Sequence, residues 1–306
     1  MKLLLLGRNG QLGWELQRAL APLGELTALG SDSVDLGDTT ALRSAVRETA
    51  PAVIVNAAAY TAVDKAESDA EQARRINADA VGVLAEEADR LGAWLVHYST
   101  DYVFDGTKAS PYCEDDPTHP LSVYGTTKLQ GEQAIRSRHA RHLIFRTSWV
   151  YAARGGNFAK TMLRLAAERT SLRVVADQHG TPTSAELLAD ITVLALYRVQ
   201  CNTTNGTALA GTYHVAASGE TTWHEYARYV VGQALARGAT LRCAPEAIEP
   251  IPSEAYPVPA LRPKNSRLDT TKLRTTFGVH LPDWRYYVAR LIDELSLQGV
   301  PWHAKA

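Results

Sequence analysis

The chain has few cysteines and almost no net charge, and each shortage excludes a class of protein. Its 306 residues include three cysteines, and the formal net charge is −1. Cys113, Cys201 and Cys243 are too few and too widely spaced for a disulfide framework or a thiolate metal site, so we expect the reducing cytoplasmic compartment. A nearly neutral chain also lacks the basic face that binding to nucleic acid requires, and no nucleic-acid partner is expected.

Long hydrophobic runs are missing as well. A short apolar stretch near the start, residues 2–6, has the sequence Lys-Leu-Leu-Leu-Leu and stops at Gly7. A membrane-spanning helix needs about 20 apolar residues, so we expect no membrane partner and predict a buried strand here. With 45% hydrophobic residues, the chain can nevertheless build a sizeable core.

The first half alternates between strand-like and helix-like patterns. Short apolar runs predict strands at residues 2–6, 25–29, 52–56, 94–98 and 142–146. Helical periodicity predicts helices at 11–21, 39–49 and 68–91, and a further helix that contains Tyr124 follows a proline-rich loop at 111–120. This alternation predicts an α/β fold of the Rossmann type, a doubly wound parallel sheet with helices on both faces. We assign residues 1–150 to this dinucleotide-binding domain, which should also receive later strands.

The second half is less regular. Helices are predicted at 157–168, 185–198, 222–237 and 284–297, and strands at 172–176 and 211–215. The polar segment 200–211 predicts a surface loop, and six prolines within 245–263 predict an extended segment. We assign residues 151–306 mainly to a smaller, discontinuous C-terminal substrate-binding domain that closes over the carboxyl edge of the sheet.

A glycine-rich turn joins the first predicted strand to the first predicted helix. Residues 7–13 have the sequence Gly-Arg-Asn-Gly-Gln-Leu-Gly, with glycines at Gly7, Gly10 and Gly13. Such glycines let the backbone approach the pyrophosphate of a dinucleotide at the N-terminus of the helix. An ordinary strand–helix turn is the alternative. The spacing resembles that of the short-chain dehydrogenase/reductase superfamily.

Tyr124 and Lys128 are four residues apart, so they share one face of a predicted helix. A phenol can donate a proton, and an ammonium group beside it favours the phenolate by lowering the pKa of the tyrosine. This spacing alone is common in surface helices. Together with the glycine turn and the predicted strand that ends near Ser99 and Thr100, it indicates a nicotinamide-dependent reductase. Since Ser99 and Thr100 alternate in direction, only one hydroxyl should face the reaction.

The end of the second predicted strand bears on the choice of cofactor. Gly30 stands where a carboxylate would bind the adenosine ribose and disfavour a 2′-phosphate, and Asp32 follows two residues later. We therefore expect NADPH as cofactor, with NADH also accepted. Asp35 and Leu36 could flank the adenine, or could belong to a plain turn before a helix.

Other candidate residues follow later strands. Small side chains after residue 56 would let the backbone pass close to the dinucleotide, although packing alone could also require alanines. Trp149 could stack on a sugar, or could be a core tryptophan. Arg262, Lys264 and Arg267 could bind a nucleotide diphosphate, or could form a solvated basic loop.

Five segments together resemble the dTDP-4-dehydrorhamnose reductases, a family of extended short-chain dehydrogenases/reductases; the segments are residues 7–16, 56–67, 99–106, 146–151 and 262–268. The likeness covers essentially the whole chain. It implies reduction of the C4 ketone of dTDP-4-dehydro-β-L-rhamnose, with Tyr124 as proton donor, Lys128 as its electrostatic partner and Thr100 on the sugar carbonyl. The implied cofactor residues are Gly7, Gly10, Gln11, Leu12, Gly13, Asp35, Leu36, Ala59, Tyr60, Thr61, Tyr98, Tyr124 and Lys128. The implied substrate residues are Thr100, Asp101, Trp149, Arg262 and Asn265.

The same resemblance suggests a metal and a second copy of the chain. Some members of this family use glutamates to bind a metal at a dimer contact, and Glu15, Glu186 and Glu294 match those positions. Carboxylates suit Mg²⁺, but scattered surface glutamates are the alternative, and no catalytic role is expected of the metal. A homodimer is the corresponding expectation for the assembly.

Two other functions remain compatible with the sequence. A nucleotide-sugar epimerase or 4,6-dehydratase belongs to the same superfamily. The dehydratase pattern is similar to Thr-Asp-Glu at this place, whereas this chain has Tyr102 after Asp101, so the glutamate is missing. A non-catalytic NADP-binding subunit, like the regulatory subunit of methionine adenosyltransferase, would keep the fold without turnover. The complete set of Thr100, Tyr124 and Lys128 favours catalysis.

Overall fold

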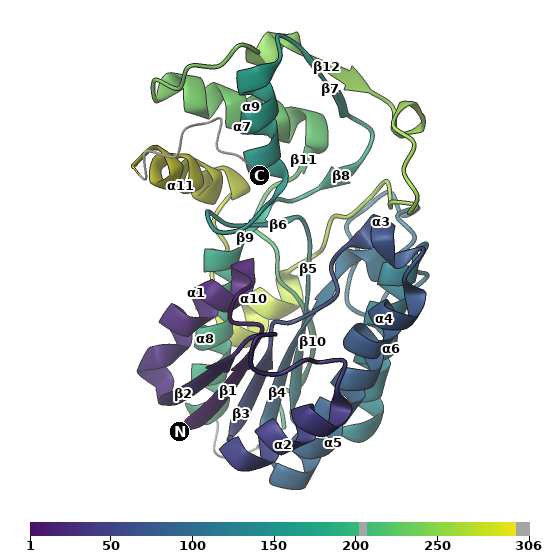
Figure 1. Ribbon diagram of the computed structural model, residues 1–306, viewed down its shortest axis with the longest axis vertical. Coiled ribbons are helices and arrows are strands. Elements are labelled where there is room, and N and C mark those ends of the chain that lie inside the picture. Colours follow the sequence, from purple (N-terminus) through teal and green to yellow (C-terminus); the bar gives the residue numbers. More distant parts are fainter. Residues whose placement is uncertain (202–206, 298–306) are drawn as a thin grey trace.

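The computed structural model describes residues 1–201 and 207–297. Figure 1 shows a larger part built around one sheet and a smaller part at one end of it. No helix in these two ranges is both long and apolar enough to cross a bilayer. Residues 202–206 of the expected surface loop lie outside the described residues, and Gln200 and Cys201 belong to a helix rather than to that loop.

The sheet contains six parallel strands in the order β10-β5-β4-β3-β1-β2. Their bounds are β1 Lys2–Leu6, β2 Glu25–Leu29, β3 Val53–Asn56, β4 Trp94–Thr100, β5 His142–Thr147 and β10 Gly211–His214. The strand order reverses between β1 and β3, which places a switch point at the carboxyl ends of these strands, where open α/β sheets bind ligands. The predicted Rossmann-type sheet is therefore confirmed, and a strand beyond residue 150 belongs to it.

Helices cover both faces of this sheet (Figure 1). One face carries α1 (Gln11–Leu20), α8 (Ala185–Cys201) and α10 (Thr271–Phe277), and the other carries α2 (Thr39–Thr49), α5 (Ala80–Leu91) and α6 (Val123–Arg138). Leu3 and Leu5 of β1 join the core on the α1 side, whereas Leu4 and Leu6 join the core on the α2 side. Successive side chains of a strand point to opposite faces, so one run of four leucines supplies both cores.

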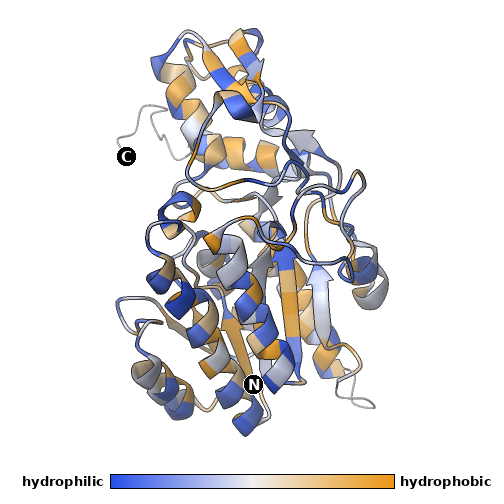
Figure 2. Ribbon diagram, turned by 90° about the vertical axis from the view of Figure 1, so that its right-hand side faces the viewer, coloured by the Kyte–Doolittle hydropathy of each residue, from blue (hydrophilic) through white to orange (hydrophobic). Residues whose placement is uncertain are grey.

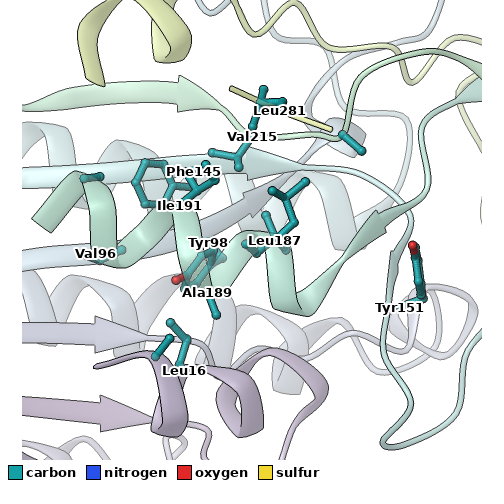
Figure 3. Packing of buried hydrophobic residues seen from close by; sticks show 14 of the residues in the cluster. Leu16, Val96, Tyr98, Phe145, Tyr151, Leu187, Ala189, Ile191, Val215 and Leu281 are labelled. Atoms are coloured by element: carbon teal, nitrogen blue, oxygen red, sulfur yellow. The ribbon is translucent and has the colours of Figure 1, made fainter. Parts of the chain in front are cut away.

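The smaller part packs three helices, α7 (Phe158–Glu168), α9 (Trp223–Ala236) and α11 (Trp284–Leu297), around short strand pairs. Those pairs are β7 (Leu172–Val175) with β12 (Ile248–Ile251), β6 (Val150–Tyr151) with β9 (Thr183–Ser184), and β8 (His179–Gly180) with β11 (Thr221–Thr222). Its core is continuous with that of the sheet, because the cluster around Leu16 and Tyr98 (Figure 3) extends to Tyr226 and Trp284. The division at residue 150 stays a prediction.

Hydropathy along the elements agrees with this layering. The strands of the sheet are largely hydrophobic, whereas the surrounding helices change between hydrophilic and hydrophobic residues along their length (Figure 2). Helices that alternate in this way bury one stripe against the sheet and expose the other to water.

Two predicted elements differ from the structure. The helix expected at 68–91 consists of α4 (Ala70–Arg74), a π-helical segment η2 (Arg75–Asp79) and then α5, after a separate turn α3 (Val63–Ala66). The wide π turn points Asn77 at the backbone of Tyr60, where it accepts from the amide at 2.9 Å and donates to the carbonyl at 3.1 Å. The segment 245–263 is extended at β12, as expected, but two 3₁₀ turns interrupt it, η4 (Pro245–Ala247) and η5 (Ser253–Ala255).

One buried ion pair fixes α6 to the sheet. The side chain of Glu132 is 0% exposed and that of Arg146, on β5, is 3% exposed, and two hydrogen bonds of 2.9 and 2.7 Å join them. Ser99 on β4 donates to the same carboxylate, and Arg136 approaches it from the next helical turn. Although burial raises the pKa of Glu132, these donors, with Arg146 foremost, hold it below its ordinary value.

We predict that Glu132→Gln destabilises the folded protein by about 3–5 kcal/mol, because it leaves the Arg146 charge buried without its partner. Urea unfolding at pH 7 measures the loss, with Glu168→Gln, which removes an exposed ion pair to Arg164, as the matched control of little effect. Since the folded-state pKa of Glu132 is depressed, its contribution should be present above the unfolded pKa and should disappear as the pH falls through the folded one. Equal stability of the two variants would contradict an anchoring role.

Candidate functional site

A cavity of about 670 Å³ opens at the carboxyl ends of the strands, beside the switch point. It runs from the glycine turn to the first residues of α6 and to the edge of the smaller part. The predicted site residues that line it are Gly7, Gly10, Gln11, Leu12, Asp35, Leu36, Ala59, Thr61, Tyr98, Thr100, Asp101, Tyr124, Lys128 and Trp149. Gly13, Tyr60, Arg262, Asn265 and the three candidate metal ligands do not line it.

The glycine turn fits a dinucleotide. Gly7 has φ = +88°, and a Cβ there would lie 2.7 Å from the backbone nitrogen of Ala58. A Cβ on Gly13 would lie 1.9 Å from the carbonyl oxygen of Gly7, so the first turn of α1 can pack on the loop only with glycine there. Gly10 is the N-cap of α1, where a Cβ would meet only the carbonyl oxygen of Gly7, at 3.4 Å, and no acidic side chain occupies the first turn. The helix N-terminus is therefore available to a pyrophosphate.

A cation that the sequence reasoning missed lies beside the cavity, near the end of β2. Gly30 and Ser31 line the cavity at the end of β2, and Arg8 and Asp32 form an ion pair of 2.7 Å beside them. Arg8 belongs to the glycine turn itself, and its Nη1 donates to the carbonyl of Ala28 on β2. A guanidinium at this place suits a 2′-phosphate, which is consistent with the expected preference for NADPH.

The alanines after β3 form the floor of the cavity. Ala57, Ala58 and Ala59 line it, and the next residue is held from behind by Asn77, which bonds both backbone groups of Tyr60. The Tyr60 hydroxyl donates to Asp69 at 3.1 Å and thus faces away from the cavity. Asn77 supports the backbone of Tyr60, and the sequence did not reveal this, because Asn77 lies among the polar residues Arg74, Arg75 and Asp79.

Thr100 and Tyr124 meet at the centre of the site. β4 ends at Thr100, and α6 begins just before Tyr124, where Ser122 caps the helix by accepting from the Gly125 amide at 3.2 Å. Burial raises the pKa of Tyr124 to about 12, and a hydrogen bond with Thr100 opposes this rise. The Ser99 hydroxyl instead donates to the buried Glu132, so of these two neighbours only Thr100 faces the phenol.

Asp101 is a second acid beside the phenol. Its carboxylate accepts from the Thr100 hydroxyl at 3.0 Å. Burial raises the pKa of Asp101 to about 6, against hydrogen bonds from Ser266 and Thr100 that lower it. A carboxyl group that titrates near neutral pH can donate to or accept from a sugar hydroxyl, which suits the substrate-binding role expected of it.

Lys128 departs from the expected arrangement. Its Nζ donates to the carbonyl of Tyr98 at 2.6 Å and lies 3.3 Å from Nε2 of His97. The causes that set the pKa of Tyr124 are burial, Thr100 and Asp101, so the expected lowering by Lys128 stays a prediction. In this arrangement the lysine head points at β4 rather than at the phenol, although both side chains lie on one helix face.

Trp149 lies at the edge between the two parts of the molecule. It follows β5, has φ = +48°, and stacks on Trp223 of the smaller part with ring centroids 3.6 Å apart. Gly180 leaves room for it, because a Cβ there would lie 2.5 Å from its ring. Both tryptophans line the cavity and are partly buried, so the pair offers an aromatic surface to a ligand while also packing against itself.

The predicted cationic loop is engaged in the protein itself. Arg262 pairs with Asp64 at 2.8 Å, and Lys264 pairs with Asp177 and Glu254. The amide nitrogen of Asn265 donates to the carbonyls of Lys108 and Ser110, and its oxygen accepts from Arg267. These contacts fix the segment around Arg262 and Asn265 to other parts of the protein. Its binding to a diphosphate stays a prediction.

The three glutamates expected to hold Mg²⁺ give no support for a metal. Within residues 1–201 and 207–297, no group of three or more His, Cys, Asp or Glu side chains could hold a metal ion. Glu15 approaches Arg18 at 3.6 Å, and Glu186 pairs with Arg290 at 3.3 Å. Burial, Glu186 and Glu294 all raise the pKa of Glu15, so the three carboxylates are neighbours whose charges repel, with arginines as partners of the first two.

A glycine turn on a Rossmann-type sheet, with a threonine, a tyrosine and a lysine at its carboxyl edge, defines the class of short-chain dehydrogenases/reductases. The family described as the RmlD substrate binding domain matches residues 1–297. The chain is 53% identical to the dTDP-4-dehydrorhamnose reductase of Escherichia coli K12 over 299 residues, which cover 96% of this chain and 98% of that protein. It therefore belongs to the dTDP-4-dehydrorhamnose reductase family.

Solved structures agree with this assignment. A dTDP-4-dehydrorhamnose reductase from Clostridium acetobutylicum superimposes with a TM-score of 0.88 at 35% identity, covering 97% of this chain and all of that one. The corresponding enzyme of Bacillus anthracis, solved in complex with NADP, gives a TM-score of 0.85 at 33% identity, covering 96% of this chain and 100% of that one.

We predict that Gly30→Asp shifts the preference for NADPH over NADH by roughly tenfold or more toward NADH, an effect of about 1.4 kcal/mol. A carboxylate at this place would repel a 2′-phosphate and accept from a ribose hydroxyl. The added Cβ would meet only the side-chain ends of Asn9 and Asp32, at 2.5 and 2.6 Å, which can move aside. The ratio of kcat/KM for the two cofactors measures the shift.

Gly30→Asn is the matched control for this prediction, because it adds the same bulk without the charge. A ratio that moves equally in both variants would attribute the effect to crowding. A ratio unchanged in both would mean that residue 30 does not face the adenosine ribose.

Proposed function

We propose that this chain reduces the C4 ketone of dTDP-4-dehydro-β-L-rhamnose to dTDP-β-L-rhamnose with NADPH as the reductant. The observation that carries the proposal is the contact of Thr100 with Tyr124 at the carboxyl edge of the sheet, in a cavity shared with the glycine turn. The names of the relatives support the substrate, and the NADP complex of one relative supports the cofactor.

The cofactor would supply the hydride, and the residues of the chain would manage the charge that this transfer creates. When substrate binds, the Thr100 hydroxyl turns its hydrogen from Asp101 to the ketone oxygen and donates a hydrogen bond there, where negative charge grows. Tyr124 gives its proton to the resulting alkoxide and leaves a phenolate. Lys128, one helical turn away, stabilises that phenolate and binds the ribose of the nicotinamide. Asp101 and Trp149 orient the sugar.

NADH as a second cofactor, a homodimer and the cytoplasmic location are part of this proposal. The exposed ion pair of Arg8 with Asp32 leaves the guanidinium able to bind either a 2′-phosphate or its present partner, so NADH need not be excluded. Tyr102 disfavours an epimerase or dehydratase, because it stands at the sequence position where the pattern of that class has a glutamate. A non-catalytic role is disfavoured by the intact pair of Thr100 and Tyr124.

We predict that Tyr124→Phe lowers turnover of the dTDP-sugar with NADPH by about 10²–10⁴-fold, the usual loss for a general acid. Dinucleotide binding should persist, since the phenol contributes little to it. Single-turnover kinetics and calorimetric binding of NADPH measure the two quantities separately.

Lys128→Met provides the comparison, because it should lose both activity and cofactor affinity. Near-normal turnover of Tyr124→Phe would reject the phenol as the proton donor. If the unsubstituted protein turns over no dTDP-4-keto sugar, the proposed function itself is rejected.

We predict that Trp149→Ala raises the KM for the dTDP-sugar by about tenfold, the size of an aromatic contact of roughly 1–1.5 kcal/mol. Cofactor affinity should change little. Trp94→Ala is the matched control, since Trp94 is also partly buried but begins β4 at the edge of the sheet opposite the cavity. Thermal melting with and without ligand separates binding from packing: a large loss of melting temperature with sugar affinity intact would leave Trp149 as a packing residue.

A further inference from the structure

Three buried polar side chains, Asn56, His97 and Lys128, form a hydrogen-bonded row beneath the site. The proposed reaction gives a role to Lys128 alone. Asn56, His97 and Lys128 are 1%, 1% and 2% exposed. Asn56 ends β3 and pairs in register with His97 of the neighbouring β4, so the two side chains stand on the same face of the sheet. That face carries α6, which brings Lys128 over His97.

Hydrogen bonds connect the three residues in a fixed order. Nδ2 of Asn56 lies 3.2 Å from Nδ1 of His97, and Nε2 of His97 lies 3.3 Å from Nζ of Lys128. The backbone amide of Ala58 donates to Oδ1 of Asn56 at 3.2 Å. This last bond sets the orientation of the carboxamide, because turning it over would place two donors, Nδ2 and the amide of Ala58, face to face.

The orientation of Asn56 decides where His97 holds its proton. Nδ2 can only donate, so Nδ1 of His97 must accept and carries no hydrogen. A neutral imidazole then has its one N–H at Nε2, directed at Lys128. An ammonium group has three donors and no acceptor, whereas a neutral amine has a lone pair that can accept this hydrogen. The amine still donates to the Tyr98 carbonyl at 2.6 Å.

Burial makes the neutral amine accessible in mildly alkaline solution. Burial lowers the pKa of Lys128 to about 8, and Glu132, one turn along α6, works in the other direction. That carboxylate is engaged by Arg146 of β5 and Arg136 of α6. Burial, followed by Lys128, lowers the pKa of His97 well below its ordinary value, so the imidazole itself stays neutral.

We propose that Asn56 and His97 are positioning residues that favour the neutral amine of Lys128 in mildly alkaline solution until the dinucleotide binds, so that binding there brings a proton to Lys128. The inference rests on the proposed roles of Tyr124 and Lys128. An anionic dinucleotide and the ribose hydroxyls beside Nζ favour the ammonium form.

Proton uptake on cofactor binding tests this directly. NADPH and NADH are titrated calorimetrically at pH 8.5 in buffers with different ionisation enthalpies, which yields the number of protons bound. With a pKa of about 8 before binding, Lys128 is roughly three-quarters neutral at this pH, so the unsubstituted protein should take up about 0.7 proton if binding raises the pKa by two units or more. Lys128→Met should take up none, and NADH should give the same uptake as NADPH.

Two variants reverse the hydrogen-bond chain. In Asn56→Asp a carboxylate oxygen accepts from Nδ1, which moves the imidazole proton away from Nε2 and lets that nitrogen accept from an ammonium. In His97→Gln a carboxamide oxygen can accept from the ammonium without any added charge. Both should reduce the uptake to about 0.2 proton or less, because Lys128 is already protonated. His214→Gln, at another buried histidine on β10, should leave the uptake unchanged.

The outcomes separate this inference from the proposed function. The inference is overturned if the unsubstituted protein takes up no proton, or if Lys128→Met takes up as much as the unsubstituted protein. The proposed function would survive either result, provided that the protein still turns over the dTDP-sugar. Folded Asn56→Asp and His97→Gln proteins with the full uptake would also overturn it, and would leave His97 as a packing residue. If one variant fails to fold, the other alone decides, and the acid limb of its pH–rate profile should move together with the uptake.

Discussion

The position of the reacting groups depends on one buried carboxylate. Glu132 lies one turn beyond Lys128 on α6, and it joins that helix to Arg146 on β5 and Ser99 on β4. A helix held only by apolar contacts can slide or rotate with little penalty, whereas a bidentate ion pair without water permits one register. Tyr124 and Lys128 occupy the two turns before this anchor, so the anchor sets their distance from the end of β4.

Close backbone contacts complete the seating of α6. A Cβ on Gly125 would lie 2.2 Å from the carbonyl of Tyr102, and a Cβ on Gly131 would lie 2.2 Å from the carbonyl of Asn77. The first contact brings Tyr124 against Thr100, because Tyr102 is only two residues beyond that threonine. The second locks α6 to the π-helical segment whose Asn77 supports the backbone of Tyr60. The helix that carries Tyr124 and the loop that lines the cavity are therefore positioned by each other.

The sequence predicted the parts of this arrangement that depend on local patterns. Short apolar runs that alternate with helical patterns predicted the five strands up to β5. The glycine turn predicted which end of the cavity would take a dinucleotide. The spacing of Tyr124 and Lys128 placed them on one helix face, but it could not say where the flexible lysine head would point, and it points at His97 and the Tyr98 carbonyl. That partner depends on the register of β3 with β4 and on the seating of α6, which no local pattern contains.

Long-range partners account for the other differences. The basic segment near Arg262 looked free to bind phosphate in the sequence, but Asp64, 198 residues earlier, neutralises its first arginine. A one-residue widening of a helix, as at η2, has no periodic signature, because the amphipathic pattern on either side remains intact. The three glutamates matched a metal site in position, yet Arg18 and Arg290 are partners of two of them.

Strand β4 joins both faces of the sheet to the reaction. Its side chains alternate, so His97 and Ser99 face α6, while the Tyr98 hydroxyl donates to Thr192 of α8 at 2.6 Å on the opposite face. The Tyr98 carbonyl meanwhile accepts from Lys128. A displacement of α8 would move Tyr98 and hence the acceptor that holds the lysine head. The acceptor of the Lys128 ammonium is therefore positioned in part by packing on the far side of the sheet, in the core around Tyr98 that Figure 3 shows.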